Sequence, residues 1–385
     1  MPPTLVAGQR STGTLNTETR RVRDVTPALS QLEPDAGPLT TLLTKLRKKA
    51  VTDPKIEWFE DQLLPRFSTL TATLATGDAT MTVNDPTYFR KGDIVRVNKS
   101  ENVLVTATPT ANPVSITRAF GEVAAAAAAV GNQLHILSNA VMEGDTGRSV
   151  LSTQRVPQYN YCQIVRDPWG LTGTAAETNT FAGKDWDEES SKQLIEHKKH
   201  LEYMFILGQR KELTTGTNPQ RASRGIERFI TTNVTDIGGT LTEALLDNFL
   251  RTAFRYGRKQ KLGFMAPIVA QAINGFAKEK LKTVVGASSY GITLTRYENA
   301  GRVVLLHEHN LMSNFDLNDF SGIGGEMLLL DIEDIMARYV KGRFTVHRTN
   351  IQANDSDSRQ DEYLSEVGLE AHQELKHGKL SGVTG

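Results

Sequence analysis

One long amphipathic helix, predicted over residues 187–211, most constrains what this chain can fold into. Acidic side chains fill its first turn and Arg210-Lys211 end it, as the helix dipole favours. Apolar residues recur at three- and four-residue steps, which predicts one buried face. They are Leu194, Leu201, Met204, Phe205 and Gly208. At ~1.5 Å per residue the helix would run about 37 Å. Because β segments flank it on both sides, we expect a spine packed against a sheet.

Residues 67–140 show a different sequence pattern. Short runs of alternating apolar and polar residues are separated by turn signals such as Asn84-Asp85-Pro86 and Lys91-Gly92-Asp93. Five strands are predicted, over residues 80–83, 94–97, 103–106, 114–117 and 134–137. Strands at about ten-residue spacing are typical of a small antiparallel barrel of the SH3 or OB kind. The alanine run 124–129 is too short for an isolated helix, so we expect a loop there.

The first 38 residues are rich in Thr, Pro, Gly and Arg and show no apolar period, which predicts an extended arm. Such an arm becomes ordered only when something outside it holds it, so it indicates an assembly. A short amphipathic helix should follow between residues 38 and 50. Its buried face would be formed by Leu39, Leu42, Leu43 and Leu46.

The rest of the chain alternates between strands and helices, which fits an α/β layer over roughly residues 215–340. Helices are predicted over 240–256, with Leu245 among the inward residues and Thr242 or Thr240 as cap, and from Pro267 to Lys282. Strands are predicted at residues 55–61, 161–166, 262–266, 303–307 and 327–330, followed by an antiparallel pair at 343–348 and 363–371.

Charge is balanced over the chain, with 44 Lys and Arg against 44 Asp and Glu. This balance excludes a protein built around one strongly basic nucleic-acid-binding domain. Locally, residues 1–50 carry eight basic and four acidic groups, whereas residues 351–385 carry seven acidic and three basic ones. Either both ends are simply solvated, or the arm of one copy lies on the other end of a neighbour.

A search for chemistry predicts no catalytic, cofactor or metal site. Phosphate-loop, dinucleotide-binding and nucleophile-elbow motifs are absent, and the single cysteine, Cys162, excludes disulfide frameworks and cysteine-rich zinc sites. His307-Glu308-His309 would need a further ligand from elsewhere, so a polar cluster at a strand end is the default. The acids Asp185, Asp187, Glu188 and Glu189 need only the helix dipole to explain them.

Basic residues also gather at the end of the helix predicted over 240–256. They are Arg251, Arg255, Arg258, Lys259 and Lys261. Dipole complementation explains them, with transient phosphate contact as the alternative. No apolar run is long enough to span a bilayer, and the opening Met1–Thr4 does not begin a signal peptide, so we expect a chain made in a reducing cytoplasm.

The order of these parts resembles that of tailed-phage major capsid proteins of the Hong Kong 97 type. The resemblance is carried by short motifs, each weak alone, that occur in the family's order. They are Lys55–Asp61 with Pro65, Phe89–Val97, Ile116–Arg118, Met142–Gly144, Asn160–Ile164 leading to Gly173–Ala175, and Leu201–Tyr203 followed by Gly208.

The resemblance implies an α+β capsid fold with an N-terminal arm, an extended loop, a peripheral domain with a spine helix, and an axial domain. The implied division is 1–50 for the arm and short helix, 51–66 and 141–183 for the extended-loop strands and the start of the peripheral domain, 67–140 for an inserted barrel-like β module, 184–214 for the spine, 215–340 for the axial domain, and 341–385 for peripheral C-terminal strands. We place the module on the extended loop, with insertion elsewhere in the peripheral domain as the alternative.

The resemblance also implies a structural protein without enzymatic activity or cofactors, which assembles as hexamers and pentamers into an icosahedral head around double-stranded DNA. Its implied partners are its own copies, a portal protein, and scaffolding or decoration proteins, with non-specific proximity to DNA and no membrane. It would reside in the virion after assembly in the host cytoplasm. The alternatives are an encapsulin-like shell and a soluble α/β enzyme. Beside the spine residues, the assembly candidates are Arg20, Arg21, Arg23, Arg90, Lys91, Arg96 and Lys99.

Overall fold

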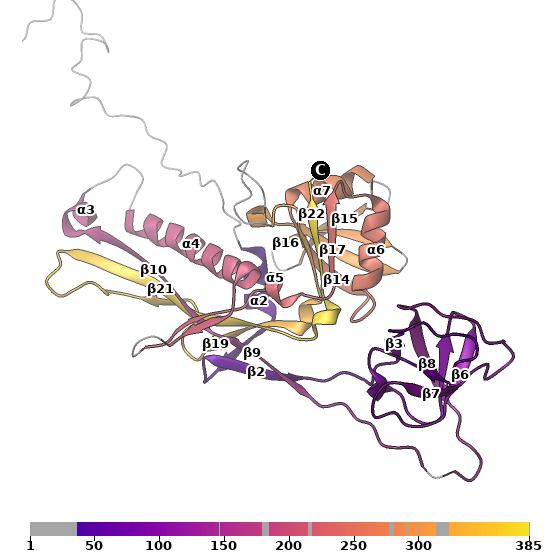
Figure 1. Cartoon of the computed structure of the whole chain (residues 1–385). Coiled ribbons are helices and arrows are strands. Elements are labelled where there is room, and N and C mark those ends of the chain that lie inside the picture. The colour runs from indigo at the N-terminus through magenta and orange to yellow at the C-terminus, as the bar shows by residue number, and fades with distance from the viewer. Residues whose placement is uncertain are drawn as a thin grey trace, which may run out of the picture. The chain divides into compact units, whose positions relative to one another are not determined.

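The computed structural model describes residues 37–145, 147–178, 185–214, 218–276, 281–289, 292–299, 301–312 and 323–384 (Figure 1). The chain divides into two compact units, of which one extends to Trp58 and resumes at Tyr159, and the other is Phe59–Gln158. Residues 1–36 of the predicted arm, which include Arg20, Arg21 and Arg23, lie outside the described residues.

The first unit contains a five-stranded sheet built around two long strands, β10 (Gln163–Thr172) and β21 (Ser358–Ala371), which pair antiparallel. Alternation of apolar and polar residues along both strands leaves one face for a helix. The long helix α4 (Asp185–Leu207) lies along that face (Figure 1). The remaining strands are β1 (Lys48–Val51), β19 (Ile335–Val340) and β20 (Val346–Arg348). Helix α2 (Pro38–Leu46) packs beside α4.

A seven-stranded mixed sheet forms the other half of the same unit, in the order β13-β22-β18-β14-β17-β16-β15. Its strands are β13 (Val234–Gly239), β14 (Gln260–Met265), β15 (Leu281–Ser289), β16 (Ile292–Asn299), β17 (Arg302–Glu308), β18 (Met327–Leu330) and β22 (Gly378–Val383). Helices α6 (Glu243–Ala253) and α7 (Pro267–Phe276) accompany it. One apolar cluster runs continuously from the spine helix into this sheet, so both halves share a core.

The second unit has its own apolar core under a six-stranded antiparallel sheet in the order β3-β8-β5-β6-β7-β4. Its strands are β3 (Phe67–Thr69), β4 (Thr80–Met81), β5 (Asp93–Val97), β6 (Glu101–Val105), β7 (Val114–Thr117) and β8 (Gln133–Asn139). A bridge between Leu70 and Val83 joins the ends of β3 and β4, so the two edges of the sheet meet. The compact unit extends well beyond residues 67–140 at both ends.

Smaller elements complete the described chain. Strands β2 (Lys55–Glu60) and β9 (Val156–Tyr161) pair where the chain leaves and re-enters the first unit. The others are the hairpin of β11 (Lys211–Leu213) with β12 (Gln220–Ala222), the helices α3 (Gly173–Glu177) and α5 (Ile226–Phe229), and the 3-10 turns η1 (Pro86–Tyr88), η2 (Asn310–Met312), η3 (Ile332–Asp334) and η4 (Glu374–Lys376).

The spine helix is shorter than predicted, and Arg210-Lys211 do not belong to it. It stops at Leu207 because Gly208 packs directly against the backbone of Ser223 and Gly225, whose N–H donates to the Gly208 carbonyl at 2.8 Å. Any side chain at position 208 would collide with that backbone. The predicted face continued through Gly208 because spacing alone cannot show this contact.

The other two predicted helices are also longer than the observed ones. Helix α6 begins after Thr242, whose Oγ1 accepts the Leu245 N–H at 3.4 Å. Leu245, predicted to face inward, is exposed because it lies in the first turn at the edge of the buried face. Helix α7 ends at Phe276, and the chain beyond it pairs with β16 as β15 instead of continuing to Lys282.

Three strand assignments differ as well. The single strand predicted at 161–166 is two strands, because Cys162 turns its N–H to the Pro54 carbonyl at 2.7 Å and the chain changes pairing partner there. Strand β19 joins the five-stranded sheet instead of ending the α/β layer. The last strand, β22, lies between β13 and β18 in the seven-stranded sheet and not beside the other C-terminal strands.

Candidate functional site

The spine helix is anchored by the residues that its spacing predicted. Leu201, Met204 and Phe205 are all buried in the shared core, whereas Leu194 is only half-buried. Four-residue spacing puts Leu201 and Phe205 on one face, with Met204 beside them. This part of the helix is therefore held by apolar packing, and Leu194 contributes less.

A buried polar chain fixes the same helix to the sheet through His197, which sequence reasoning missed. Nδ1 of His197 donates to Asp167 Oδ2 on β10 at 2.5 Å, and Nε2 lies 2.7 Å from Ser365 Oγ on β21. Burial lowers the pKa of His197, so the neutral ring accepts the Ser365 hydroxyl. The other carboxylate oxygen of Asp167 accepts from His200 at 2.8 Å.

This Asp–His–Ser order matches the geometry of a hydrolase triad, but the serine cannot act as a nucleophile. Ser365 and His197 are completely buried, and Ser365 Oγ already accepts the Thr345 N–H at 2.9 Å. A nucleophile needs room for a substrate carbonyl beside it and donors for the oxyanion. The chain of hydrogen bonds thus joins α4, β10, β21 and the loop before β20 structurally.

A second buried polar centre lies further along the same helix, at Glu202. Glu202 accepts the backbone N–H groups of Leu39 at 2.8 Å and Thr40 at 2.6 Å, and so caps α2 across about 160 residues of sequence. It also accepts from Nε2 of His309 at 2.6 Å, while Nδ1 of His309 accepts the Leu311 N–H at 3.2 Å. Three chain segments converge on this one carboxylate.

Both histidines of the His307-Glu308-His309 sequence lie edge-on to Phe264, with ring centroids 5.8 Å and 5.7 Å from its own. His309 in addition binds Glu202. Within the described part of the chain, no group of three His, Cys, Asp or Glu side chains is arranged to hold a metal ion. Cys162 is buried, and burial raises its thiol pKa to about 12.

Several acidic side chains of the C-terminal region are engaged within their own unit. Glu362 on β21 pairs with Arg166 at 2.6 Å and Arg348 at 3.1 Å, and Glu370 pairs with Arg338. Glu374 accepts the Thr231 N–H at 2.6 Å. Local pairing therefore accounts for these three carboxylates.

Two of the basic residues predicted at the end of α6 have separate local roles. Lys261 is buried and donates to the carbonyls of Ala253 at 2.6 Å and Tyr256 at 2.9 Å, and therefore closes the helix. Arg258 pairs with Glu333. No helix in the described residues is long and apolar enough to cross a membrane.

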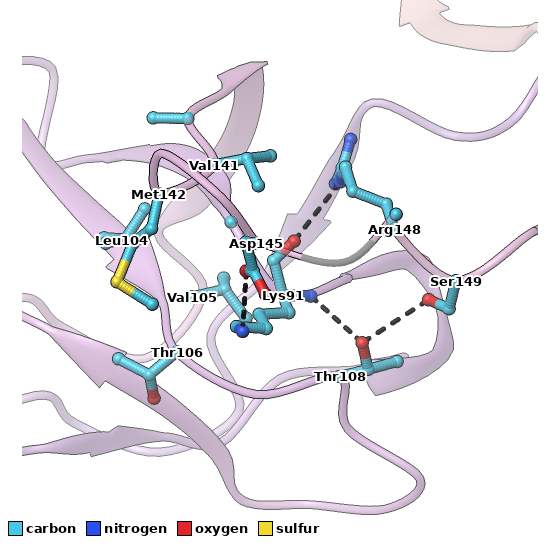
Figure 2. Close-up of a pocket in the computed structure, with 13 residues that line it drawn as sticks. Lys91, Leu104, Val105, Thr106, Thr108, Val141, Met142, Asp145, Arg148 and Ser149 are labelled. Atoms are coloured by element: carbon cyan, nitrogen blue, oxygen red, sulfur yellow. Dashed lines mark hydrogen bonds and ion pairs between the residues drawn. The ribbon is translucent and has the colours of Figure 1, made fainter.

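In the second unit, Figure 2 shows a hollow of about 360 Å³ between the sheet and the segment that follows β8. Leu104, Val141 and Met142 form its apolar side, and Met142 is 71% exposed. The polar side is closed by Lys91, whose Nζ lies 2.8 Å from Asp145 Oδ2 and whose backbone N–H donates to Thr108 at 3.1 Å. Lys91 therefore braces this segment onto the sheet.

The other basic candidates of this unit also have intramolecular contacts. Arg90 donates weakly to the Ser149 carbonyl at 3.5 Å, and Arg96 Nε donates to the Lys99 carbonyl at 2.7 Å. Lys99 itself adopts a left-handed turn with φ of 65°. Sequence reasoning overlooked the buried Glu101, which binds Arg118 through two hydrogen bonds of 2.7 Å. Glu101 also accepts the N–H groups of Ala119 at 3.2 Å and Ala126 at 3.1 Å, and so fixes the loop between β7 and β8.

Comparison with known proteins places these observations in a family. Residues 8–384 match the family model described as SU10 major capsid protein. A protein of Pseudomonas phage PaMx41 named "Major capsid protein" is 23% identical over 302 residues, which cover 74% of this chain and 71% of the relative.

Solved structures were compared as well. The capsid of a native GTA particle, computed with C5 symmetry, superposes with a TM-score of 0.51 at 8% identity, covering 98% of this chain and all of that one. A structure from Mycobacterium phage Bobi has a TM-score of 0.48 at 8% identity, covering 98% of this chain and all of its own. The superposition on the GTA capsid shows a shared capsid fold of mixed α and β structure.

Proposed function

The chain belongs to the SU10 major capsid protein family and is the major capsid protein of a tailed-phage head, and from this premise we propose that its copies assemble as hexamers and pentamers into an icosahedral shell around double-stranded DNA. The observation that carries this proposal is the family match, which spans nearly the whole chain from residue 8 to residue 384. The protein is structural and not an enzyme, and it is a component of the virion.

Five-fold vertices are supported by the fold. The GTA capsid that shares this fold was computed with C5 symmetry, which requires rings of five subunits. Pentamers alone can close a small icosahedral shell, and hexamers beside them make a larger one, which is the arrangement that we propose. Assembly would take place in the host cytoplasm, with a portal protein at one vertex and scaffolding or decoration proteins as further partners. DNA would lie against the shell through non-specific contacts.

We further propose that the five-stranded sheet with α4 is the peripheral domain and that most of residues 215–340 form the axial domain. The second unit would be a small closed barrel inserted into the extended loop. This placement is supported by the separate apolar core of that unit, by the bridge between Leu70 and Val83, and by the paired strands β2 and β9 through which the chain enters and leaves it.

Negative-stain microscopy of the purified chain tests the assembly directly. We expect closed shells, or free hexamers and pentamers. A uniform monomer of 42.4 kDa at every concentration and salt condition would contradict the proposal. An encapsulin-like shell would be smaller and would form without a portal, so co-expression with the portal protein separates the two kinds of shell.

A further inference from the structure

Two arginines of the first unit lie on segments that contact each other through the backbone of Gly208 and Gly225. Arg210 follows the end of α4, and Arg224 lies between β12 and α5. Both are half-buried, and neither forms a salt bridge within the described ranges. Two adjacent cations that are partly withdrawn from water and unpaired are unfavourable in an isolated subunit.

The pair is held rigidly in this position. Arg210 stacks over the Tyr159 ring, with its Cζ 3.8 Å from the ring centroid, and its Nη1 donates to the Tyr159 carbonyl at 2.6 Å. Arg224 donates through Nε to the Arg228 carbonyl at 3.1 Å and lies over the Phe229 ring. These contacts leave most of the five N–H donors of each guanidinium without a partner.

The backbone beneath the pair is equally fixed. The side chain of Asn160, which is buried, accepts the Arg224 N–H at 2.8 Å and donates to the Arg224 carbonyl at 3.1 Å. The contact between Gly208 and Gly225 brings the two arginine-bearing segments together. Burial and, after it, the charge of Arg210 lower the pKa of Arg224, which is consistent with repulsion between the two head groups.

The charge of Glu374 acts favourably on Arg224, but no hydrogen bond or ion pair joins the two side chains within the described ranges. Glu374 accepts the N–H and hydroxyl of Thr231 at 2.6 and 2.7 Å and the N–H of Thr232. Lys55, whose Nζ lies 4.9 Å from the Tyr159 ring centroid, adds a third cation to the surroundings and is itself paired with Glu57. Arg210 and Arg224 therefore keep guanidinium N–H donors without a direct carboxylate partner, and Arg210 lies over a Tyr159 ring that is 37% exposed.

We propose that Arg210 and Arg224 form a docking site for a carboxylate side chain of a second copy of this chain, so that their remaining N–H donors gain an acceptor when subunits assemble. The inference rests on the proposed assembly. Arginine and tyrosine are enriched at protein interfaces, and a guanidinium binds a carboxylate through two parallel hydrogen bonds. Phosphate of packaged DNA is the other candidate anion. A fixed, half-buried pair favours a ligand at a fixed position, whereas non-specific phosphate contact relies on exposed, mobile cations.

The test compares the double variant Arg210→Glu/Arg224→Glu with the charge-matched control Lys198→Glu/Lys259→Glu, whose lysines are exposed and unpaired in the described structure. Circular dichroism should show folded subunits for both. The subunit concentration that gives half-maximal assembly, measured by light scattering, should rise about tenfold or more for the arginine variant and change far less for the control. Equal assembly of wild type and arginine variant would overturn the inference but leave the proposed function intact. If the wild-type chain itself fails to assemble, the proposed function fails first.

A second variant identifies the partner. In Arg224→Lys, a carbodiimide reagent should join the new lysine to a carboxylate, and shells mixed from light and isotopically heavy subunits should yield light–heavy cross-linked peptides. Cross-links confined to one subunit would overturn the inference. The inference would also be overturned if Arg210→Glu/Arg224→Glu assembled normally but lost affinity for a DNA oligonucleotide, because that outcome assigns the site to phosphate.

Discussion

The carboxylate of Glu202 lies 2.6 Å from Nε2 of His309, and both side chains are completely buried although 107 residues separate them in the sequence. The same carboxylate caps α2 through the N–H groups of Leu39 and Thr40. One side chain of the spine helix therefore determines where the N-terminal helix begins and where the chain turns after β17. A substitution at Glu202 should therefore perturb both the start of α2 and the turn after β17.

Glu202→Ala should destabilise the subunit by roughly 3–5 kcal/mol, because it leaves two backbone donors and a buried imidazole N–H without an acceptor. Urea unfolding of dissociated subunits, followed by circular dichroism, measures the loss. The matched control is Glu196→Ala on the same helix, whose side chain is 52% exposed and which should change the free energy of unfolding by less than about 0.5 kcal/mol. Equal effects of the two variants would show that Glu202 is not a structural centre.

Leu201 tests the apolar anchoring of the spine. Leu201→Ala should cost about 2–5 kcal/mol, because it opens a cavity in the core shared by both sheets, and Leu201→Asp should give insoluble subunits. Leu194→Ala, at a half-buried position of the same helix, should cost clearly less. Yield in the soluble fraction and the urea midpoint report both effects, and soluble Leu201→Asp subunits that assemble would refute the packing.

Cys162 should not react in the folded protein. Its side chain is buried, and burial raises the thiol pKa to about 12, so almost no thiolate is present near neutral pH. A colourimetric disulfide reagent at pH 8 should label the chain only after urea is added, with the rate following unfolding. Rapid labelling of assembled, folded protein would show that the strand junction at Cys162 opens.

The spacing of apolar residues in the sequence predicted strands and buried side chains correctly where an element buries one face. The apolar run at Met327–Leu330 is β18 with the predicted bounds, and Leu201, Met204 and Phe205 are buried as their spacing indicated. The short alternating runs of the second unit likewise correspond to strands, although their arrangement as an inserted barrel remains a proposal.

The same spacing did not predict the ends and types of elements that depend on contacts between segments distant in the sequence. Gly208 ends α4 because of the backbone of Ser223, and β15 forms because β16 lies beside it. The chain from Asp167 through His197 to Ser365 spans separations of 30 and 168 residues, so no local motif could indicate it. The only available signal was a histidine among charged residues of the predicted helix, and its burial cannot be read from the sequence.

Acid should destabilise the subunit through His377. Burial lowers the pKa of His377 to about 4, and its Nδ1 accepts the Asp331 N–H at 3.2 Å. Above pH ~6.5 both folded and unfolded states carry a neutral ring, so the group has no effect on stability. As the pH falls below that value, the unfolded state gains a proton that the folded state excludes, and about 3 kcal/mol of stability is lost by pH 4.

The measurement is the pH dependence of the free energy of unfolding between pH 7 and 4. His377→Gln should flatten this dependence, whatever its effect at neutral pH, whereas His135→Gln on an exposed position of β8 should leave it unchanged. Paired carboxylates with lowered pKa values, such as Glu370, also lose stability in acid and contribute equally to both variants. An unchanged slope in His377→Gln would contradict the assignment.

The second unit should act as a clamp in the assembled shell. Replacing residues 62–154 by a short Gly/Ser linker keeps β2 and β9 available to pair, and the first unit should still fold because its apolar core contains no residue of the second. Assembled particles that lack the unit should melt at least about 5 °C lower than intact particles. Raised salt should lower the melting temperature of intact particles, because it weakens the contacts of exposed cations such as Arg96. Glu101→Ala, which removes the two hydrogen bonds from Arg118, provides a milder control that loosens the unit without deleting it. If particles with and without the unit melt at the same temperature, it decorates the shell and does not hold it together.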